Sequence, residues 1–180
     1  MIANLLYTAI FANTLNFQAS VSTERDKRAF EQVRKFTQLS PDWPEIYYSE
    51  LARAVFANPR EAIIKDTKVV TNKAGEKMAI GQIELWSGKK FITRFQKQIS
   101  EVLENFCYKT WFLTLPSISE GKNYLFTQSE AAKKLLIRLL KIKFIGDIAT
   151  TDKLYLRKEL LKKLQKLQQT CFKTSTPRLV

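Results

Sequence analysis

The chain has few of the residues that let a backbone turn sharply: five glycines and five prolines in 180 residues. An all-β sandwich or barrel needs a turn about every 8–12 residues and draws on Gly, Asn and Pro for most of them. Apolar residues instead recur at intervals of three and four along much of the chain, which is the spacing of a helix face. The sequence therefore predicts an all-α fold, a compact and mainly helical bundle.

The segment 68–86 is less clearly helical. Val69-Val70-Thr71 favours a strand and Asn72 to Gly75 favours a turn, whereas Met78–Trp86 fits either a returning strand or the start of a helix. We expect a small β-hairpin or an exposed loop here, as an excursion from the helical bundle.

Capping residues mark several helix boundaries. Asp42, followed by Pro44 and Glu45, is typical of a helix start, and so is Thr127-Gln128-Ser129-Glu130. The pair Asn58-Pro59 ends a helix, because the residue before a proline disfavours helical geometry. The expected helices span residues 2–19, 23–39, 42–57, 60–65, 89–113, 127–145 and 152–172.

A chain of this length with 45% hydrophobic residues can bury one sizeable core, so residues 1–180 are expected to form a single helical domain. Within that domain, the polar and turn-forming residues of 116–124 are typical of a linker. The sequence thus suggests two lobes, 1–115 and 125–180, joined by the linker 116–124.

Positive charge is concentrated near the C-terminus. Residues 111–180 hold 14 Lys and Arg against 5 Asp and Glu, which is nine of the thirteen net positive charges. The basic residues recur at helical spacing, which predicts three basic stripes: Lys90, Arg94 and Lys97; Lys134, Arg138 and Lys141; and Lys158, Lys162 and Lys166, with Arg157 beside the last. Such stripes attract polyanions over a Debye length of about 8–10 Å, so nucleic acid is the expected partner.

Catalytic chemistry is not indicated by the residues. The chain has no histidine, the commonest general base near neutral pH and a common zinc ligand. Neither a phosphate-cradling Gly-rich loop nor a nucleophile elbow is present. The sequence predicts a protein that is not an enzyme and has no catalytic residue, no metal and no cofactor.

The first 23 residues carry no charged side chain, but Asn4, Asn13 and Asn16 interrupt their apolar run. This pattern fits neither a signal peptide nor a membrane span. Cys107 and Cys171 lie in apolar helical patterns, as expected for thiols in a reducing compartment. We expect a cytoplasmic protein that does not bind membranes.

The three basic stripes and the abrupt, uncapped start Met1-Ile2-Ala3-Asn4-Leu5-Leu6 resemble those of the small subunit of a CRISPR Cascade (type I) surveillance complex. That family consists of compact, basic, helical proteins without catalytic residues, and some members are internally initiated C-terminal products of the large-subunit gene. The resemblance implies a non-catalytic subunit of an RNA-guided complex. Its basic helix faces would hold the phosphate backbone of the displaced DNA strand and of the guide–target duplex.

The same resemblance implies other subunits of a ribonucleoprotein complex as partners, including further copies of the chain. Two other interpretations stay open from the residues alone. One is a free-standing basic helical DNA-binding protein or regulator. The other is a helical scaffold whose lysines face solvent or an acidic protein and which has no nucleic-acid function.

Overall fold

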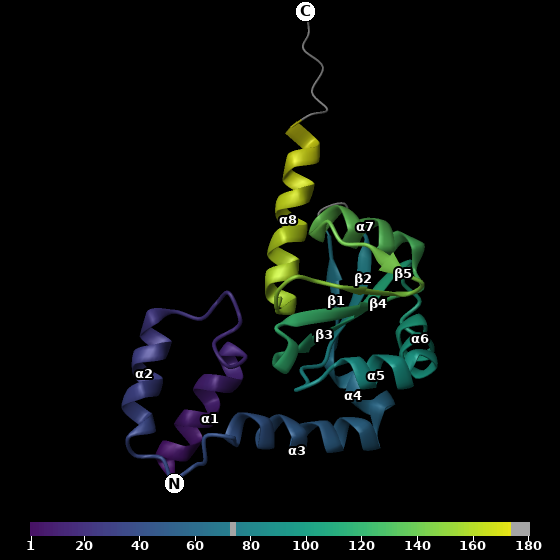
Figure 1. The fold of residues 1–180 in the computed structure, drawn as a ribbon. Helices are drawn as coiled ribbons and strands as arrows, with labels where there is room; N and C mark the ends of the chain where they lie inside the picture. The colour runs from purple at the N-terminus through teal and green to yellow at the C-terminus, as the bar shows by residue number, and fades with distance from the viewer. Residues whose placement is uncertain (73–74, 174–180) are drawn as a thin grey trace, which may run out of the picture.

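The computed structural model describes residues 1–72 and 75–173, with side chains described as far as residue 167. The six strands form one mixed sheet in the order β1-β2-β3-β4-β6-β5. In Figure 1 this sheet lies between α7 and α5. The elements are α1 (Ile2–Thr14), α2 (Glu24–Arg34), α3 (Trp43–Ala57), α4 (Pro59–Asp66), β1 (Thr67–Thr71), β2 (Lys77–Gln82), α5 (Lys89–Arg94), α6 (Gln96–Glu104), β3 (Thr110–Ser117), the 3₁₀ turn η1 (Ile118–Glu120), β4 (Lys122–Phe126), α7 (Glu130–Leu140), β5 (Phe144–Ile145), β6 (Ile148–Thr150) and α8 (Arg157–Lys173).

The strands β2 and β3 run parallel, and the other neighbouring strands run antiparallel. Two parallel strands cannot be joined by a tight turn, so the chain needs a crossover between them. Helices α5 and α6 form that crossover. This β-α-α-β unit is the centre of the sheet, and antiparallel strands extend it on both sides.

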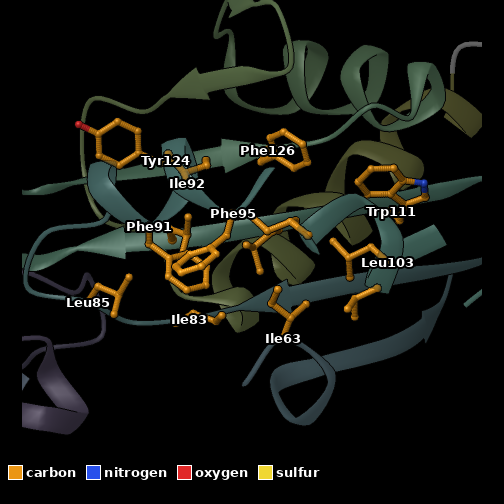
Figure 2. Packing of buried hydrophobic residues seen from close by; sticks show 14 of the residues in the cluster. Ile63, Ile83, Leu85, Phe91, Ile92, Phe95, Leu103, Trp111, Tyr124 and Phe126 are labelled. Carbon is orange, nitrogen blue, oxygen red and sulfur yellow. The ribbon is translucent and has the colours of Figure 1, made fainter. Parts of the chain in front are cut away.

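Different helices cover the two faces of the sheet. On one face, Phe91 of α5 packs in a cluster with Trp111 of β3 (Figure 2). On the other face, Leu136 of α7 and Leu160 of α8 pack in a cluster with Phe112. Successive strand residues point to opposite faces, so neighbouring residues of β3 enter different cores.

Helices α1, α2 and α3 form a third layer beside the sheet (Figure 1). Its core is aromatic: Tyr7 stacks on Phe30 with ring centroids 4.4 Å apart, and Phe11 and Tyr48 are almost fully buried. Leu156, which precedes α8, belongs to the same cluster. This contact ties the helical layer to the start of α8.

The predicted all-α fold is wrong, because the structure is a mixed α/β fold with a six-stranded sheet. A helix was expected over 89–113, but α6 ends at Glu104 and Cys107 takes a left-handed φ of 57° before β3 begins. Seven of the eight residues of β3 are buried, since both faces of the sheet are covered. A strand buried on both faces is continuously apolar, and periodicity does not separate it from a buried helix.

The hairpin suggested for 68–86 exists as the pair β1–β2, but it is one edge of the sheet and not an excursion from a helical bundle. Lys73 and Ala74 of that segment lie outside the described residues. The expected linker 116–124 forms the end of β3, η1 and the start of β4, with Gly121 at a φ of 65°. Residues 174–180 of the suggested C-terminal lobe also lie outside the described residues.

The first helix is shorter than the expected span 2–19. It ends at Thr14 because Leu15, Asn16 and Phe17 all take positive φ values, of 50°, 54° and 63°. Such a run is unfavourable for residues with a Cβ atom. Leu15 is fully buried, so packing in the aromatic layer holds the turn in place.

A buried amide joins the sheet to the segment that precedes α8. Asn123 of β4 is fully buried, and its Nδ2 donates to Thr114 Oγ1 at 2.6 Å and to the Tyr155 carbonyl at 2.8 Å. Its Oδ1 accepts from the Tyr155 backbone N–H at 2.8 Å, and its own backbone N–H donates to Thr151 Oγ1 at 2.8 Å. These bonds satisfy the buried polar groups of the loop that precedes α8. Without them, burying these groups would cost free energy.

We predict that Asn123→Leu lowers the free energy of unfolding by about 2–4 kcal/mol, because it leaves buried backbone groups of Tyr155 without partners. Equilibrium denaturation in urea measures this loss. Asn105→Ala is the matched control, since Asn105 is exposed at the end of α6, and its effect should stay within about 0.5 kcal/mol. Similar losses in the two variants would contradict the assigned role of Asn123.

Candidate anion-binding cleft

A cleft of about 540 Å³ lies where the C-terminal end of β2 meets the start of α8 and the last turn of α1. Three of its lining residues carry a positive charge and one is a carboxylic acid, so we call it the cationic cleft. The lining residues are Ala12, Asn13, Lys68, Gln82, Glu84, Leu156, Arg157, Lys158 and Leu161. Ligands of open α/β sheets bind preferentially beyond the carboxyl ends of the strands, which is where this cleft lies.

Arg157, the first residue of α8, is anchored to β2 and to the end of α4. Its Nη1 donates to the Ile80 carbonyl at 3.3 Å and also to the Asp66 carbonyl. Burial lowers the pKa of Arg157, and the nearby Asp66 and Glu84 carboxylates partly offset that effect. A guanidinium nevertheless keeps its charge in proteins and has five N–H donors, so donors remain for an anion.

Lys68 and Lys158 complete the positive side of the cleft. Lys68 lies on β1 opposite Ile80 of β2, and Lys158 follows Arg157 on α8. Both side chains are exposed, and neither forms an ion pair within the described part of the chain. Two ammonium groups and one guanidinium are thus available to the same bound anion.

Gln82 connects the two sides of the cleft. Its Oε1 accepts a hydrogen bond from the backbone N–H of Arg157, and its Nε2 donates to Glu84 Oε1 at 2.9 Å. The start of α8 is further capped by Glu159, whose Oε2 accepts from the Leu156 backbone N–H at 2.8 Å. The first turn of α8 is therefore held in place from the sheet and from within the helix.

Glu84 is a partly buried carboxylic acid in this positive environment. Burial raises its pKa and the nearby Asp66 adds to the rise, whereas the bond from Gln82 and the charges of Arg157 and Lys158 act against it. The net direction is upward, so burial outweighs the attraction of the cations. Glu84 thus holds its proton to a higher pH than an ordinary glutamic acid.

Tyr48 of α3 lies close to Glu84. Burial is the main cause that raises the pKa of Tyr48, and the Glu84 carboxylate adds to it. Tyr48 Oη is buried, and it is the one buried side-chain oxygen or nitrogen without a hydrogen-bond partner among the described residues. Tyr48 Oη therefore forms no hydrogen bond with Glu84.

The sheet separates the first predicted basic stripe from the other two. Helices α5 and α6, with Lys90, Arg94 and Lys97, pack on one face of the sheet, whereas α7 and α8 pack on the other. All the stripe residues on these helices are exposed: Lys90, Arg94, Lys97, Lys134, Arg138, Lys158, Lys162 and Lys166. Lys141, also exposed, follows α7 as its C-cap. Of the ten predicted residues, only Arg157 and Lys158 line the cationic cleft.

The sequence interpretation missed Lys68, Gln82 and Glu84. Gln82 and Glu84 alternate with apolar residues at the end of a strand. This alternation is a signal from which a strand ending in two polar residues could have been predicted. Lys68 gives no such signal, because its place depends on the register Lys68↔Ile80 between β1 and β2.

Two other hollows are less suited to an anion. One, of about 220 Å³ between β1 and α8, has no basic residue among its described lining residues. The other is a shallow hollow of about 460 Å³ beside Phe56, which Lys89, Lys90 and Arg94 border. Arg94 lies over the Phe95 ring, 5.3 Å from its centroid, and no carboxyl or amide group lines this hollow among the described residues.

Residues 1–72 and 75–173 contain no group of three or more His, Cys, Asp or Glu residues placed to hold a metal ion. No helix within these ranges is both long enough and apolar enough to cross a membrane.

A scan against protein-family models found no match, and a search of curated proteins found none either. The fold is similar to a solved structure, "Methanococcus jannaschii putative family II inorganic pyrophosphatase", with a TM-score of 0.69 and 22% sequence identity. The match covers 91% of this chain and 54% of that one, so this chain spans about half the length of that protein. At this identity the likeness shows a shared fold.

This likeness corrects the interpretation drawn from the basic stripes. The resemblance to a CRISPR Cascade small subunit is wrong, because the chain has the mixed α/β fold of the solved structure and not an all-helical one. The role as a nucleic-acid-binding subunit is overturned with it. So is the prediction that the chain is not an enzyme, because the fold is shared with a protein described as a pyrophosphatase.

The alternatives of a basic helical DNA-binding protein and of a helical scaffold also assumed an all-helical fold, and they gain no support from the mixed sheet. The nucleic-acid contacts assigned to individual stripe residues, and self-association of the chain, stay predictions.

We predict that Arg157→Met lowers the free energy of unfolding by about 1–3 kcal/mol, because the backbone carbonyls of Asp66 and Ile80 lose this donor. Urea denaturation measures the change. Lys158→Met removes an equal charge one residue later, from an exposed side chain, and should change stability by about 0.5 kcal/mol or less. Equal effects of the two substitutions would show that Arg157 does not anchor α8.

Proposed function

We propose that the chain is a phosphoanhydride hydrolase that binds pyrophosphate in the cationic cleft. The observation that carries this proposal is the convergence of Lys68, Arg157 and Lys158 on one cleft at the end of β2. The likeness to a protein described as an inorganic pyrophosphatase supports the choice of anion. Hydrogen bonds between such cations and phosphate oxygens are charge-assisted and stronger than neutral ones.

The roles follow from the geometry of the side chains. Arg157 is fixed by its bonds to the Asp66 and Ile80 carbonyls and presents a planar set of donors, which suits two oxygens of one phosphate group. Lys68 and Lys158 are exposed point charges on flexible stems and can follow the second phosphate group. Asn13, at the α1 side of the cleft, adds an amide that can donate to a phosphate oxygen.

The described residues account for the binding of an anion more clearly than for the activation of a water molecule. They contain no metal-holding cluster, and the match covers only 54% of the similar protein. Pyrophosphate itself brings oxygen ligands for Mg²⁺, a cation that proteins bind through few carboxylates together with substrate phosphates. We therefore assign the cationic cleft to substrate binding and charge neutralisation during hydrolysis. A cytoplasmic location, where pyrophosphate would be met, is part of the same proposal.

The test combines binding and turnover. Pyrophosphate binding is measured by calorimetry, and phosphate release from pyrophosphate is measured with Mg²⁺ present. We expect Lys158→Ala to weaken binding and to lower kcat/KM by about tenfold or more, because it removes a charge-assisted contact. Lys162→Ala, one turn further along α8 and outside the cleft lining, is the matched control and should change either value by less than about twofold.

The absence of both pyrophosphate binding and phosphate release in the wild-type chain would refute the proposed function. Equal losses in Lys158→Ala and Lys162→Ala would show that the anion responds to net charge and not to the cationic cleft. Binding without phosphate release would refute the hydrolase assignment and leave an anion-binding protein.

A further inference from the structure

The hydrogen bonds around Gln82 fix which oxygen of Glu84 can carry a proton. The backbone N–H of Arg157 can only donate, so the Gln82 atom that receives this bond must be the amide oxygen. The amide nitrogen then faces Glu84, where it donates to Oε1 at 2.9 Å. Glu84 Oε1 is therefore an acceptor, and the proton of a neutral Glu84 sits on Oε2.

Glu84 Oε2 is accessible from solvent. No hydrogen bond to this oxygen occurs within the described part of the chain. Among the described residues, Tyr48 Oη is the one buried side-chain oxygen or nitrogen without a partner. Glu84 Oε2 also has no partner, so it is not a buried atom. Glu84 itself lines the cationic cleft. A neutral Glu84 therefore presents an O–H donor to whatever anion occupies the cleft.

The groups that face Glu84 come from every element around it. Arg157 and Lys158 of α8 and Lys68 of β1 are the cations, Asp66 of α4 is the second acid, and Tyr48 of α3 is the buried phenol. The part of α1 that lines the cleft, Ala12 and Asn13, carries no titratable side chain.

We propose that Glu84 is a proton-carrying donor of the cationic cleft: its neutral form donates from Oε2 to an oxygen of a bound phosphate or similar tetrahedral anion. This inference rests on the proposed function, because it names a further contact of the same cleft. Its consequence is that anion binding and proton binding at Glu84 are coupled. When Glu84 is ionised, the donor is lost and a negative charge faces the anion.

The direction of the coupling follows from the charges. A bound anion favours the neutral form of Glu84, so binding takes up a proton from solution wherever free Glu84 is ionised. Affinity is highest below the pKa of free Glu84. It falls as the pH rises through that pKa and levels off above the pKa of the anion-bound form. The upward direction of the Glu84 pKa, caused mainly by burial, moves this fall toward neutral pH.

Calorimetry with sulfate tests the coupling, because sulfate is tetrahedral and does not change its protonation between about pH 5.5 and about pH 8.5. Proton uptake is obtained from the binding heat in buffers of different ionisation enthalpy. We expect the wild-type chain to take up a fraction of a proton per sulfate, and to bind sulfate on the order of tenfold more weakly at the upper pH than at the lower.

Two variants and a control separate this role from a structural one. Glu84→Gln places an uncharged amide donor at the position of Oε2, so it should bind sulfate without proton uptake and with little dependence on pH. Glu84→Met has no donor, and at the lower pH it should bind on the order of tenfold more weakly than Glu84→Gln. Glu104→Gln, at an exposed carboxyl at the end of α6, should behave as wild type.

The outcomes distinguish the two proposals. Equal proton uptake in the wild-type chain and Glu84→Gln would overturn the role of Glu84 while leaving anion binding intact. Coupled binding without phosphate release from pyrophosphate would overturn the hydrolase assignment and leave Glu84 as the donor. The same measurements with pyrophosphate provide a second probe, because its own protonation cancels between the wild-type chain and Glu84→Gln. Binding of neither anion would overturn both proposals.

Discussion

The arrangement of the cationic cleft depends on the buried amide of Asn123. Its side chain satisfies both the N–H and the carbonyl of Tyr155, two residues before α8 begins. In an exposed loop, the backbone groups of Tyr155 would bond to water instead. The buried bonds to Asn123 therefore fix the start of α8 against the sheet more accurately than an exposed loop could. The amide of Gln82, bonded to the N–H of Arg157, provides the second fixed point. Two buried or half-buried amides thus set the place of the cations on α8.

The sheet explains why those cations meet residues that are distant in the sequence. Lys68 and Glu84 are brought near α8 by the register of β1 against β2 and by the packing of α8 on the sheet. The aromatic layer of α1, α2 and α3 closes the cleft from the other side through Ala12 and Asn13. Each wall of the cleft therefore belongs to a different part of the core, so substitutions in any of the three cores can disturb the cleft.

The sequence predicted the helices better than the strands. Helices α3 and α4 both begin close to the expected residues. Pro44 and Pro59 mark the first turn of each helix, and this signal is local in the sequence. The strand β3 was missed since its residues are buried on both sides and show no alternation. Arg157 and Lys158 were named as nucleic-acid-binding residues, on or beside a stripe along α8 and not in a cleft. Their partners across the cleft depend on strand pairing, which local patterns do not reveal.

The charge of the chain also shows why the number of basic residues is a poor guide to a site. Nine basic residues were placed on three stripes, with Arg157 beside the last, yet the sheet separates the first stripe from the other two. Exposed charges further apart than a Debye length are largely screened. Three cations line one cleft, so their attractions for an anion in that cleft add together. A carboxyl group among them weakens that attraction when it is ionised and strengthens it when it is neutral. Under the proposed function, the protonation state of Glu84 therefore sets how strongly the cleft holds pyrophosphate.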